Sequence, residues 1–534
     1  MMDHRLAGRT NVLPAPNHLP FAMRGLSLEL QASIIKHLGV HDIFHLQQTC
    51  KSLNTLIEGN VEVWKACLKR HCHVEGLFWS SFNGLTKASE YKNACTGIQR
   101  FKRLCRTAKL SQIGKRRHLP AKVSGNPADE SDSTGDEGSY ALKNPYPGIN
   151  SAYLVPGGRF LVTVEQAWLL LWDLLPLGKV GEPVVLLREK LDCNKDVKIL
   201  DVLPLDGGRL RLVLNEPLPD GFPPSYNVDQ YASRNDTKML ALHRFEIRLP
   251  ENGDYTVQKL GRLCIAYLGY DDSQVAQGEH SIAVDISGCL LFWGSNDSGE
   301  EYTFWASYED VDRSSIFMHQ GYLFLVTRSS LGAINLSKLP RNPVKGGIVD
   351  IQCSYRLRAP AKVEDVVTCE IDTELPEGDF GMGQILLPNP VPKAGTVKYD
   401  MELHHWGGEV AYKLYRMTFD FRPDAPAKSD LRLFGVLEDY DWCDDYISPR
   451  NRFECGGGDF GYIWEKTDGL QVVSVSIYGG DDKKFKPVEI GVPENESVEI
   501  EDSDVLFCPF SGRAVILWDR TLTEEKLIEI VDFL

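Results

Sequence analysis

The chain has 534 residues, of which 43% are hydrophobic and 25% are charged, and its formal net charge is −16. One hydrophobic core stops growing at roughly 250–300 residues, so we expect at least two folding units, and this apolar content excludes wholesale disorder. An acidic surface repels phosphate backbones, which argues against nucleic-acid binding and favours basic partners.

The cysteines and the apolar runs of the sequence indicate the cellular compartment in which we expect the protein. The 13 cysteines are scattered along a chain too long to need a disulfide framework, so we expect reduced thiols in the cytoplasm, the nucleus or both. The first twenty residues contain no continuous apolar segment that could be a signal-peptide core. The most apolar run, Ala167–Leu171, is far below the roughly 20 residues of a membrane-spanning helix. We therefore expect neither secretion nor membrane insertion.

Helical periodicity dominates between Leu26 and Leu68. The first predicted helix has apolar residues four apart, at Leu26, Leu30, Ile34 and Leu38. Gly39 is expected to end it, and Asp42 is expected to cap the second helix through its carboxylate. A short turn through Leu53, Leu56 and Ile57 and a fourth helix with Val61, Trp64 and Leu68 follow. This unit is too small to bury its apolar residues well, so its remaining apolar surface is expected to meet a partner.

The order of these residues, beginning L-S-x-E-L-x-x-x-I-I at Leu26 and ending at Trp64, resembles the F-box motif. The resemblance implies docking on the Skp-type linker of a cullin-RING ubiquitin ligase. Carried over position by position, it places these residues in or behind the docking surface: Leu26, Ser27, Glu29, Leu30, Ile34, Ile35, Leu46, Cys50 and Trp64. The family usually has Leu-Pro where this chain has Leu26-Ser27, which would reduce preorganisation although serine can cap a helix. The alternative is a generic helical hairpin that packs on the rest of the chain.

The segment Phe78–Lys109 also reads as helical and ends in a basic stretch, which Lys115, Arg116 and Arg117 continue. These cations predict either a nuclear-import signal or charged patch, or a solvated helix face. The segment Pro120–Pro147 is rich in Gly, Ser, Pro, Asp and Glu, as expected of a flexible acidic linker.

From about Ile149 short apolar and aromatic runs alternate with turn residues, which is typical of many antiparallel strands. Glycine-containing turns separate strand pairs at Gly157-Gly158, Ser287-Gly288 and Ser511-Gly512. These pairs, which end near Trp172, Trp293 and Trp518, resemble the blades of WD-repeat β-propellers.

Four segments match this strand pattern more weakly, namely LHRFEI, LGAINL, YKLYRM and VVSVSIY, and they bring the expected number of blades to seven. A β-sandwich or barrel with aromatic core residues is the alternative. Closing a propeller requires the last strand to pair within a blade begun elsewhere in the chain, and Ile528–Leu534 is the candidate segment.

The sequence has no nucleophile elbow, phosphate loop, dinucleotide fingerprint or metalloprotease helix, so we expect no enzyme activity and no cofactor. One tight cluster, Cys67, His71, Cys72 and His73, lacks the distant second ligand pair of a structural zinc site. Paired carboxylates could also suggest glycoside hydrolysis, against which the missing secretion signal counts.

A loop rich in acidic and aromatic residues, between Asp439 and Asp445, could bind a basic, partly apolar peptide by charge pairing and cation–π contact. The candidate substrate-binding residues are Asp439, Tyr440, Asp441, Trp442, Asp444 and Asp445. A solvated acidic turn is the alternative interpretation.

We therefore expect a multidomain protein, in which a small all-α F-box-like bundle precedes a large all-β domain, a seven-bladed β-propeller. The predicted segments are a disordered N-terminus at 1–23, an F-box-like motif at 24–70, a helical extension at 71–118, an acidic linker at 119–148 and the propeller at 149–534. The expected function is that of a substrate-recognition adaptor of an SCF-type ubiquitin ligase, which binds a Skp-type linker, through it a cullin, and an unknown protein substrate. The alternative is a non-catalytic scaffold or regulatory protein outside the ubiquitin system.

Overall fold

The computed structural model describes residues 25–107 and 114–119 and, with short gaps, 149–218 and 237–350. Beyond these it describes the strands between 366 and 491 given below, and residues 500–520 and 525–534. Contacts between residues divide the chain into two compact units, one comprising 1–71 and 86–95 and the other 72–85 and 96–534. In the described part, no helix combines the length and the apolar character needed to cross a membrane.

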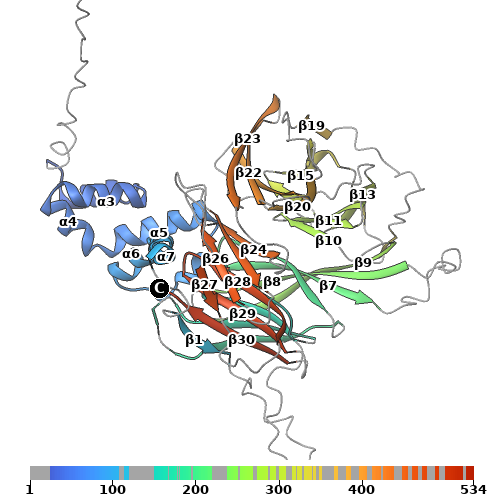
Figure 1. Cartoon of the computed structure of the whole chain (residues 1–534), viewed down its shortest axis with the longest axis horizontal. Helices are drawn as coiled ribbons and strands as arrows, with labels where there is room; N and C mark the ends of the chain where they lie inside the picture. Colours follow the sequence, from blue (N-terminus) through green and yellow to red (C-terminus); the bar gives the residue numbers. More distant parts are fainter. Residues whose placement is uncertain are drawn as a thin grey trace, which may run out of the picture. The chain divides into compact units, whose positions relative to one another are not determined.

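The described residues of the first unit are helical (Figure 1). The helices are α2 (Leu28–Ile35), α3 (Val40–Thr49), α4 (Lys51–Glu58), α5 (Val61–Glu75), which continues into the second unit, and α6 (Ala88–Cys95). Side chains from four of them form a core that contains Ile35, Ile43, Ile57 and Trp64, all fully buried.

The caps of these helices differ in one place from the sequence-based prediction. Helix α3 begins after Gly39, so the prediction that Asp42 is its cap is wrong. Asp42 lies instead in the first turn, where its charge favours the positive end of the helix dipole. Helix α5 has a side-chain cap, because Asn60 Oδ1 accepts a hydrogen bond from Val63 N at 3.1 Å.

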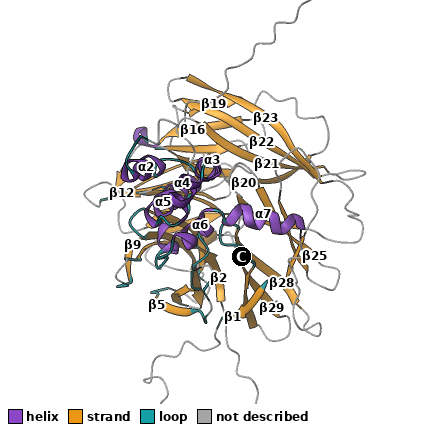
Figure 2. Ribbon diagram, turned by 90° about the vertical axis from the view of Figure 1, so that its left-hand side faces the viewer, coloured by secondary structure: helices purple, strands orange, loops and turns teal. Residues whose placement is uncertain are grey.

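In the second unit the described strands form seven sheets, shown in orange in Figure 2. The first sheet contains β2 (Ile149–Leu154), β3 (Phe160–Glu165), β4 (Trp168–Asp173) and β5 (Val184–Lys190). The second contains β6 (Lys198–Leu205), β7 (Arg209–Leu218), β8 (Thr237–Arg248), β9 (Thr256–Leu268) and β18 (Ile348–Asp350). The third contains β10 (Ser273–Gln277), β11 (Ser281–Ile286), β12 (Cys289–Ser295), β13 (Glu301–Ser307) and β17 (Asn342–Pro343).

The remaining four sheets follow the same plan. The fourth contains β14 (Ser315–His319), β15 (Tyr322–Val326), β16 (Ser330–Asn335) and β19 (Val366–Glu370). The fifth contains β20 (Phe380–Leu386), β21 (Thr396–His405), β22 (Tyr412–Arg422) and β23 (Ala425–Leu437), and the sixth contains β24 (Ser448–Glu454), β25 (Phe460–Lys466), β26 (Val472–Ile477) and β27 (Val488–Gly491). The seventh contains β28 (Ile500–Cys508), β29 (Arg513–Arg520), β30 (Glu525–Asp532) and β1 (Lys115–His118).

Each sheet is built mainly from consecutive antiparallel strands, and the first strands of successive sheets meet. Strand β2 contacts both β6 and β28, while β10 contacts β6 and β14. This arrangement confirms the expected helical region followed by a large all-β region with propeller-like sheets, and a division into seven sheets excludes a two-sheet sandwich.

The seven segments that the sequence suggested as blades lie in seven different sheets, one in each. Gly157 and Gly158 have φ values of 102° and 72°, which fits the predicted turn before β3. Trp172 and Trp293 lie on the third strands of their sheets and are fully buried. Trp518 differs, because β29 is the second strand of the seventh sheet, so the three tryptophan endings are not equivalent.

The strand β1 was not predicted. Lys115–His118 pairs antiparallel with β30, so residues expected in a free basic patch or on a helix face belong to the seventh sheet. Arg116 lies 3.0 Å from Glu529, and Arg117 lies 2.6 Å from Asp532. The predicted final strand at Ile528–Leu534 overlaps β30, and its partner β1 comes from before residues 119–148, the segment predicted as a linker. A pairing of this kind was expected of the last strand of a propeller.

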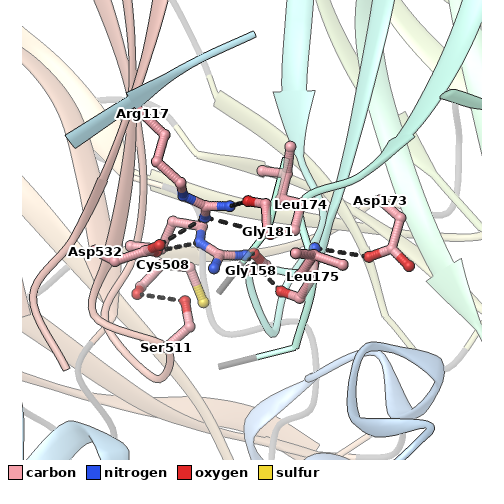
Figure 3. Close-up of polar contacts among 10 residues, drawn as sticks. Arg117, Gly158, Asp173, Leu174, Leu175, Gly181, Cys508, Ser511 and Asp532 are labelled. Carbon is pink, nitrogen blue, oxygen red and sulfur yellow. Dashed lines mark hydrogen bonds and ion pairs between the residues drawn. The ribbon is translucent and has the colours of Figure 1, made fainter. Parts of the chain in front are cut away.

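Side chains join the seventh sheet to the first (Figure 3). The Asp532 carboxylate accepts hydrogen bonds from Arg117 and, at 2.5 Å, from the buried Arg513. Arg513 also donates to the carbonyl oxygens of Gly158 and Leu175, at 2.6 and 2.9 Å. A Cβ on Gly158 would lie 2.0 Å from Ser511 Oγ, so this junction requires a glycine there. We refer to Arg117, Asp532 and Arg513 as the closing triad.

The second unit also contains helical segments: the short helices η1 (Trp79–Phe82) and η4 (Leu336–Lys338), and α7 (Gly97–Thr107). Helix α7 packs on the seventh sheet, where the ring of Phe101 lies 5.0 Å from that of Phe507 and 6.0 Å from that of Phe533. The predicted helical extension at 71–118 thus divides between the two units, with α6 in the first and α7 in the second.

Candidate docking site

Helix α2 exposes large apolar side chains to solvent. Leu28, Leu30 and Ile34 are 61%, 54% and 44% exposed, and Val184 of β5, at 53%, is the other large hydrophobic residue exposed to this degree in the described part. Leu30 and Ile34 are four residues apart, so their side chains lie next to each other on one face of the helix. An apolar face of this kind indicates a surface that another protein covers.

The ends of α2 are fixed by polar contacts. Ser27 is the N-cap, and its hydroxyl accepts a hydrogen bond from Leu30 N at 3.5 Å. Hydrogen bonds to its own backbone and to Ser27 lower the pKa of Glu29, which favours a negative charge at the positive end of the helix dipole. At the other end, the Arg70 guanidinium donates to the carbonyl oxygens of Lys36 and Leu38.

An aromatic and charged cluster joins the other helices of the first unit. The fully buried Trp64 donates from Nε1 to the carbonyl of Ile57 at 3.0 Å, and its ring lies 5.6 Å from that of Phe44. Lys92 of α6 lies over both rings, 5.5 Å from Phe44 and 5.6 Å from Trp64, and pairs with Glu58 at 2.9 Å. The side chains of α6 therefore help to hold the helices that present α2.

The first unit thus combines a helix that has an exposed apolar face with a buried tryptophan and four further helices. Residues 23–63 match the family model of the F-box domain. Helices α2, α3 and α4 and the start of α5 form an F-box. F-box domains bind Skp1-type linkers, and the match runs from α2 to the start of α5. Helix α6, which packs on this F-box through Lys92, lies beyond the matched residues.

No curated protein matches the chain. Among solved structures, the chain is similar to the WD40 domain of SCAP from fission yeast, with 11% identity, a TM-score of 0.34 and coverage of 72% of this chain and 84% of that one. It is similar to Hsv2 from Kluyveromyces lactis, with 10% identity, a TM-score of 0.35 and coverage of 70% of this chain and 90% of that one. It is also similar to the polysaccharide lyase Uly1, with 8% identity, a TM-score of 0.32 and coverage of 77% of this chain and 95% of that one. All three TM-scores are below 0.5, and the propeller-like fold is established by the sheet topology.

The nine residues predicted for the F-box docking surface separate into three groups by exposure. Ser27, Glu29, Leu30 and Ile34 are exposed, Leu26, Leu46 and Cys50 are half-buried, and Ile35 and Trp64 are fully buried. The buried residues can act only by supporting the surface, and contact of the exposed residues with a linker stays a prediction. Leu28 was missed, because it lies in the first turn and outside the four-residue spacing of Leu26, Leu30 and Ile34.

The structure adds no support to the other sites that the sequence suggested. The candidate substrate loop, Asp439, Tyr440, Asp441, Trp442, Asp444 and Asp445, lies outside the described residues. Within the described ranges, no group of three or more His, Cys, Asp or Glu residues is arranged to hold a metal ion. In the Cys/His cluster of α5, burial and the nearby His41 lower the pKa of His71 to about 4.

Proposed function

We propose that this protein is a substrate-recognition adaptor of an SCF-type cullin-RING ubiquitin ligase. The observation that carries the proposal is the exposed apolar face of α2, at Leu30 and Ile34, within the matched F-box. In this function the F-box binds a Skp-type linker, the linker connects the chain to a cullin, and the large β region selects a protein substrate. The chain positions that substrate for ubiquitin transfer, performs no bond chemistry itself, and works in the cytoplasm, the nucleus or both.

The first test replaces each of the two exposed residues, as Leu30→Asp and Ile34→Asp. A charge in the centre of an apolar interface must be desolvated when the partner binds, so each substitution should weaken binding of the Skp-type linker at least tenfold. Both side chains face solvent in the free chain, so the thermal unfolding midpoint should change little. Binding is measured by titrating purified linker into the full-length chain.

The matched control is Val184→Asp, which puts the same charge on a similarly exposed apolar residue of β5. It should leave linker binding unchanged. If both α2 variants retain full linker binding, the adaptor function fails, and a scaffold outside the ubiquitin system, the second candidate function, is favoured.

The second test concerns the substrate. Proteins labelled in proximity to the wild-type chain in cells are compared with those labelled by the Leu30→Asp, Ile34→Asp double variant. Substrates of an adaptor should accumulate with the double variant, because they still bind the β region and are no longer passed to the ligase. If no labelled protein changes in abundance, the proposed role in degradation is contradicted.

A further inference from the structure

Three polar side chains lie on the first strands of successive sheets, where these strands contact one another. They are Tyr153 on β2, Asp201 on β6 and Gln277 on β10, and both β2 and β10 contact β6. Gln277 Nε2 donates to Asp201 Oδ2 at 3.0 Å, a direct hydrogen bond between the second and third sheets. We call these three residues the inner acidic site.

The backbone of β6 is irregular at Asp201. The register of β6 against β7 shifts between Ile199 and Asp201, and such bulges redirect a side chain relative to its sheet. Asp201 Oδ1 accepts a hydrogen bond from Val202 N at 2.9 Å, so its hydrogen-bond partners in the described residues are an amide side chain and a backbone N–H. Neither partner carries a charge, and burial raises the pKa of Asp201 to about 6.

Gln277 adds a second acceptor. The residue is 8% exposed, and its Oε1 atom is buried without a hydrogen-bond donor from the described residues. Nε2 of the same amide is engaged by Asp201, whose carboxylate forms no ion pair with the described residues. The two side chains therefore have acceptors in excess of donors.

Tyr153 supplies a phenol hydroxyl near the Asp201 carboxylate. It is half-buried, and burial together with the nearby Asp201 carboxylate raises the pKa of its hydroxyl. A carboxylate, an amide oxygen and a phenol hydroxyl can each accept a hydrogen bond from an ammonium group.

We propose that the inner acidic site binds a protonated primary amine, the chemistry of a lysine side chain. An ammonium group has three donors and no acceptor, which matches the acceptor oxygens of Asp201, Gln277 and Tyr153. The net charge of −16 attracts such a ligand over a long range. The site does not depend on the F-box, and its failure would leave the proposed adaptor function standing.

The test titrates Nα-acetyl-lysine methylamide into the full-length chain at pH 7.5 and follows binding by ligand-observed NMR. The norleucine analogue, which has the same stem without the amine, is the comparison ligand. The lysine derivative should bind at least tenfold more tightly than the norleucine analogue. Its binding should weaken at least threefold at pH 5, where Asp201 is mostly protonated. A lysine-containing peptide that binds more tightly than the derivative identifies a protein side chain as the ligand, whereas equal affinity identifies a free amine.

The variants separate recognition from stability. Asp201→Asn removes the charge and Gln277→Leu removes the free acceptor, and each should reduce the preference for the amine to less than threefold. Asp206→Asn is the matched control, an exposed aspartate on the turn after β6 of the same sheet, and it should bind like the wild type. Equal binding of the two ligands by the wild type, or undiminished binding by Asp201→Asn, would overturn the proposal. If Gln277→Leu does not fold, binding of the two ligands by Asp201→Asn tests the proposal alone.

Discussion

Asp201 forms hydrogen bonds with uncharged groups of the described residues, so the stability of the folded protein depends on whether this carboxyl is ionised. Its pKa rises from the ordinary 3.8 to about 6 in the folded protein, so the folded state holds this proton more tightly than the unfolded chain does. Protonation of Asp201 therefore stabilises the folded state fully at a pH below the pKa of the unfolded chain, and this stabilisation is lost as the pH rises through about 6. Over this window the loss is at most about 3 kcal/mol, because one pKa unit corresponds to about 1.4 kcal/mol.

We therefore expect Asp201→Asn to unfold at a higher temperature than the wild type at pH 7, with little difference at pH 4. The midpoints are measured by thermal denaturation at several pH values in a buffer free of amines, since an amine would neutralise the charge by binding. Asp206→Asn should follow the wild type throughout. A constant offset between Asp201→Asn and the wild type at all pH values would contradict the assignment.

At the scale of elements, Ser27 explains how helix α2 begins without the usual proline. Its φ of −63° is the value that a proline ring imposes, so the backbone already has the conformation that proline would fix. The hydrogen bond from Leu30 N to Ser27 Oγ is long at 3.5 Å, which makes serine a modest cap.

We expect Ser27→Pro to keep α2 intact and to leave the affinity for a Skp-type linker within about twofold, because a gain in preorganisation offsets the lost cap. Ser33→Pro is the matched control. It lies inside the same helix, where proline costs about 3 kcal/mol, and should abolish linker binding. Helix content is followed by circular dichroism and affinity by titration. A complete loss of binding in Ser27→Pro would show that the Ser27 hydroxyl itself is required.

The elements that the sequence predicted are those in which local periodicity decides the structure. Spacings of three and four residues predicted the F-box helices, and the short apolar runs with glycine turns predicted strand pairs such as β3 and β4. Lys92 was not predicted to support the F-box, because its partners Phe44, Glu58 and Trp64 are distant in sequence. Strand β1 was missed for a related reason: KRRH has no apolar alternation, and its structure depends on pairing with β30 and on Glu529 and Asp532.

For the whole molecule, β1 changes where the β region begins. A fragment that starts at residue 149, the boundary predicted from sequence, would lack β1 and leave β30 as an unprotected edge. Its Asp532 would lose Arg117 from the closing triad.

We expect a fragment of residues 149–534 to unfold at a lower temperature than a fragment of residues 108–534, which keeps β1 and also lacks α7, and to aggregate more readily. Thermal denaturation and light scattering of the two fragments compare them directly. In the longer fragment, Arg117→Gln should cause a smaller decrease in the unfolding midpoint than removal of the whole strand, because the ladder between β1 and β30 remains. Equal midpoints for the two fragments would mean that β1 contributes nothing to the stability of the seventh sheet.

The pairing of β1 with β30 also sets the order of events during synthesis. Arg117 and Asp532 are 415 residues apart in the sequence. At roughly 5–20 residues per second, a ribosome needs about 20–80 s to travel from one to the other. The segment that becomes β1 leaves the ribosome early and has no partner until translation is nearly complete. A premature stop codon between α6 and β30 therefore yields a chain that can present finished docking helices but can never complete its seventh sheet.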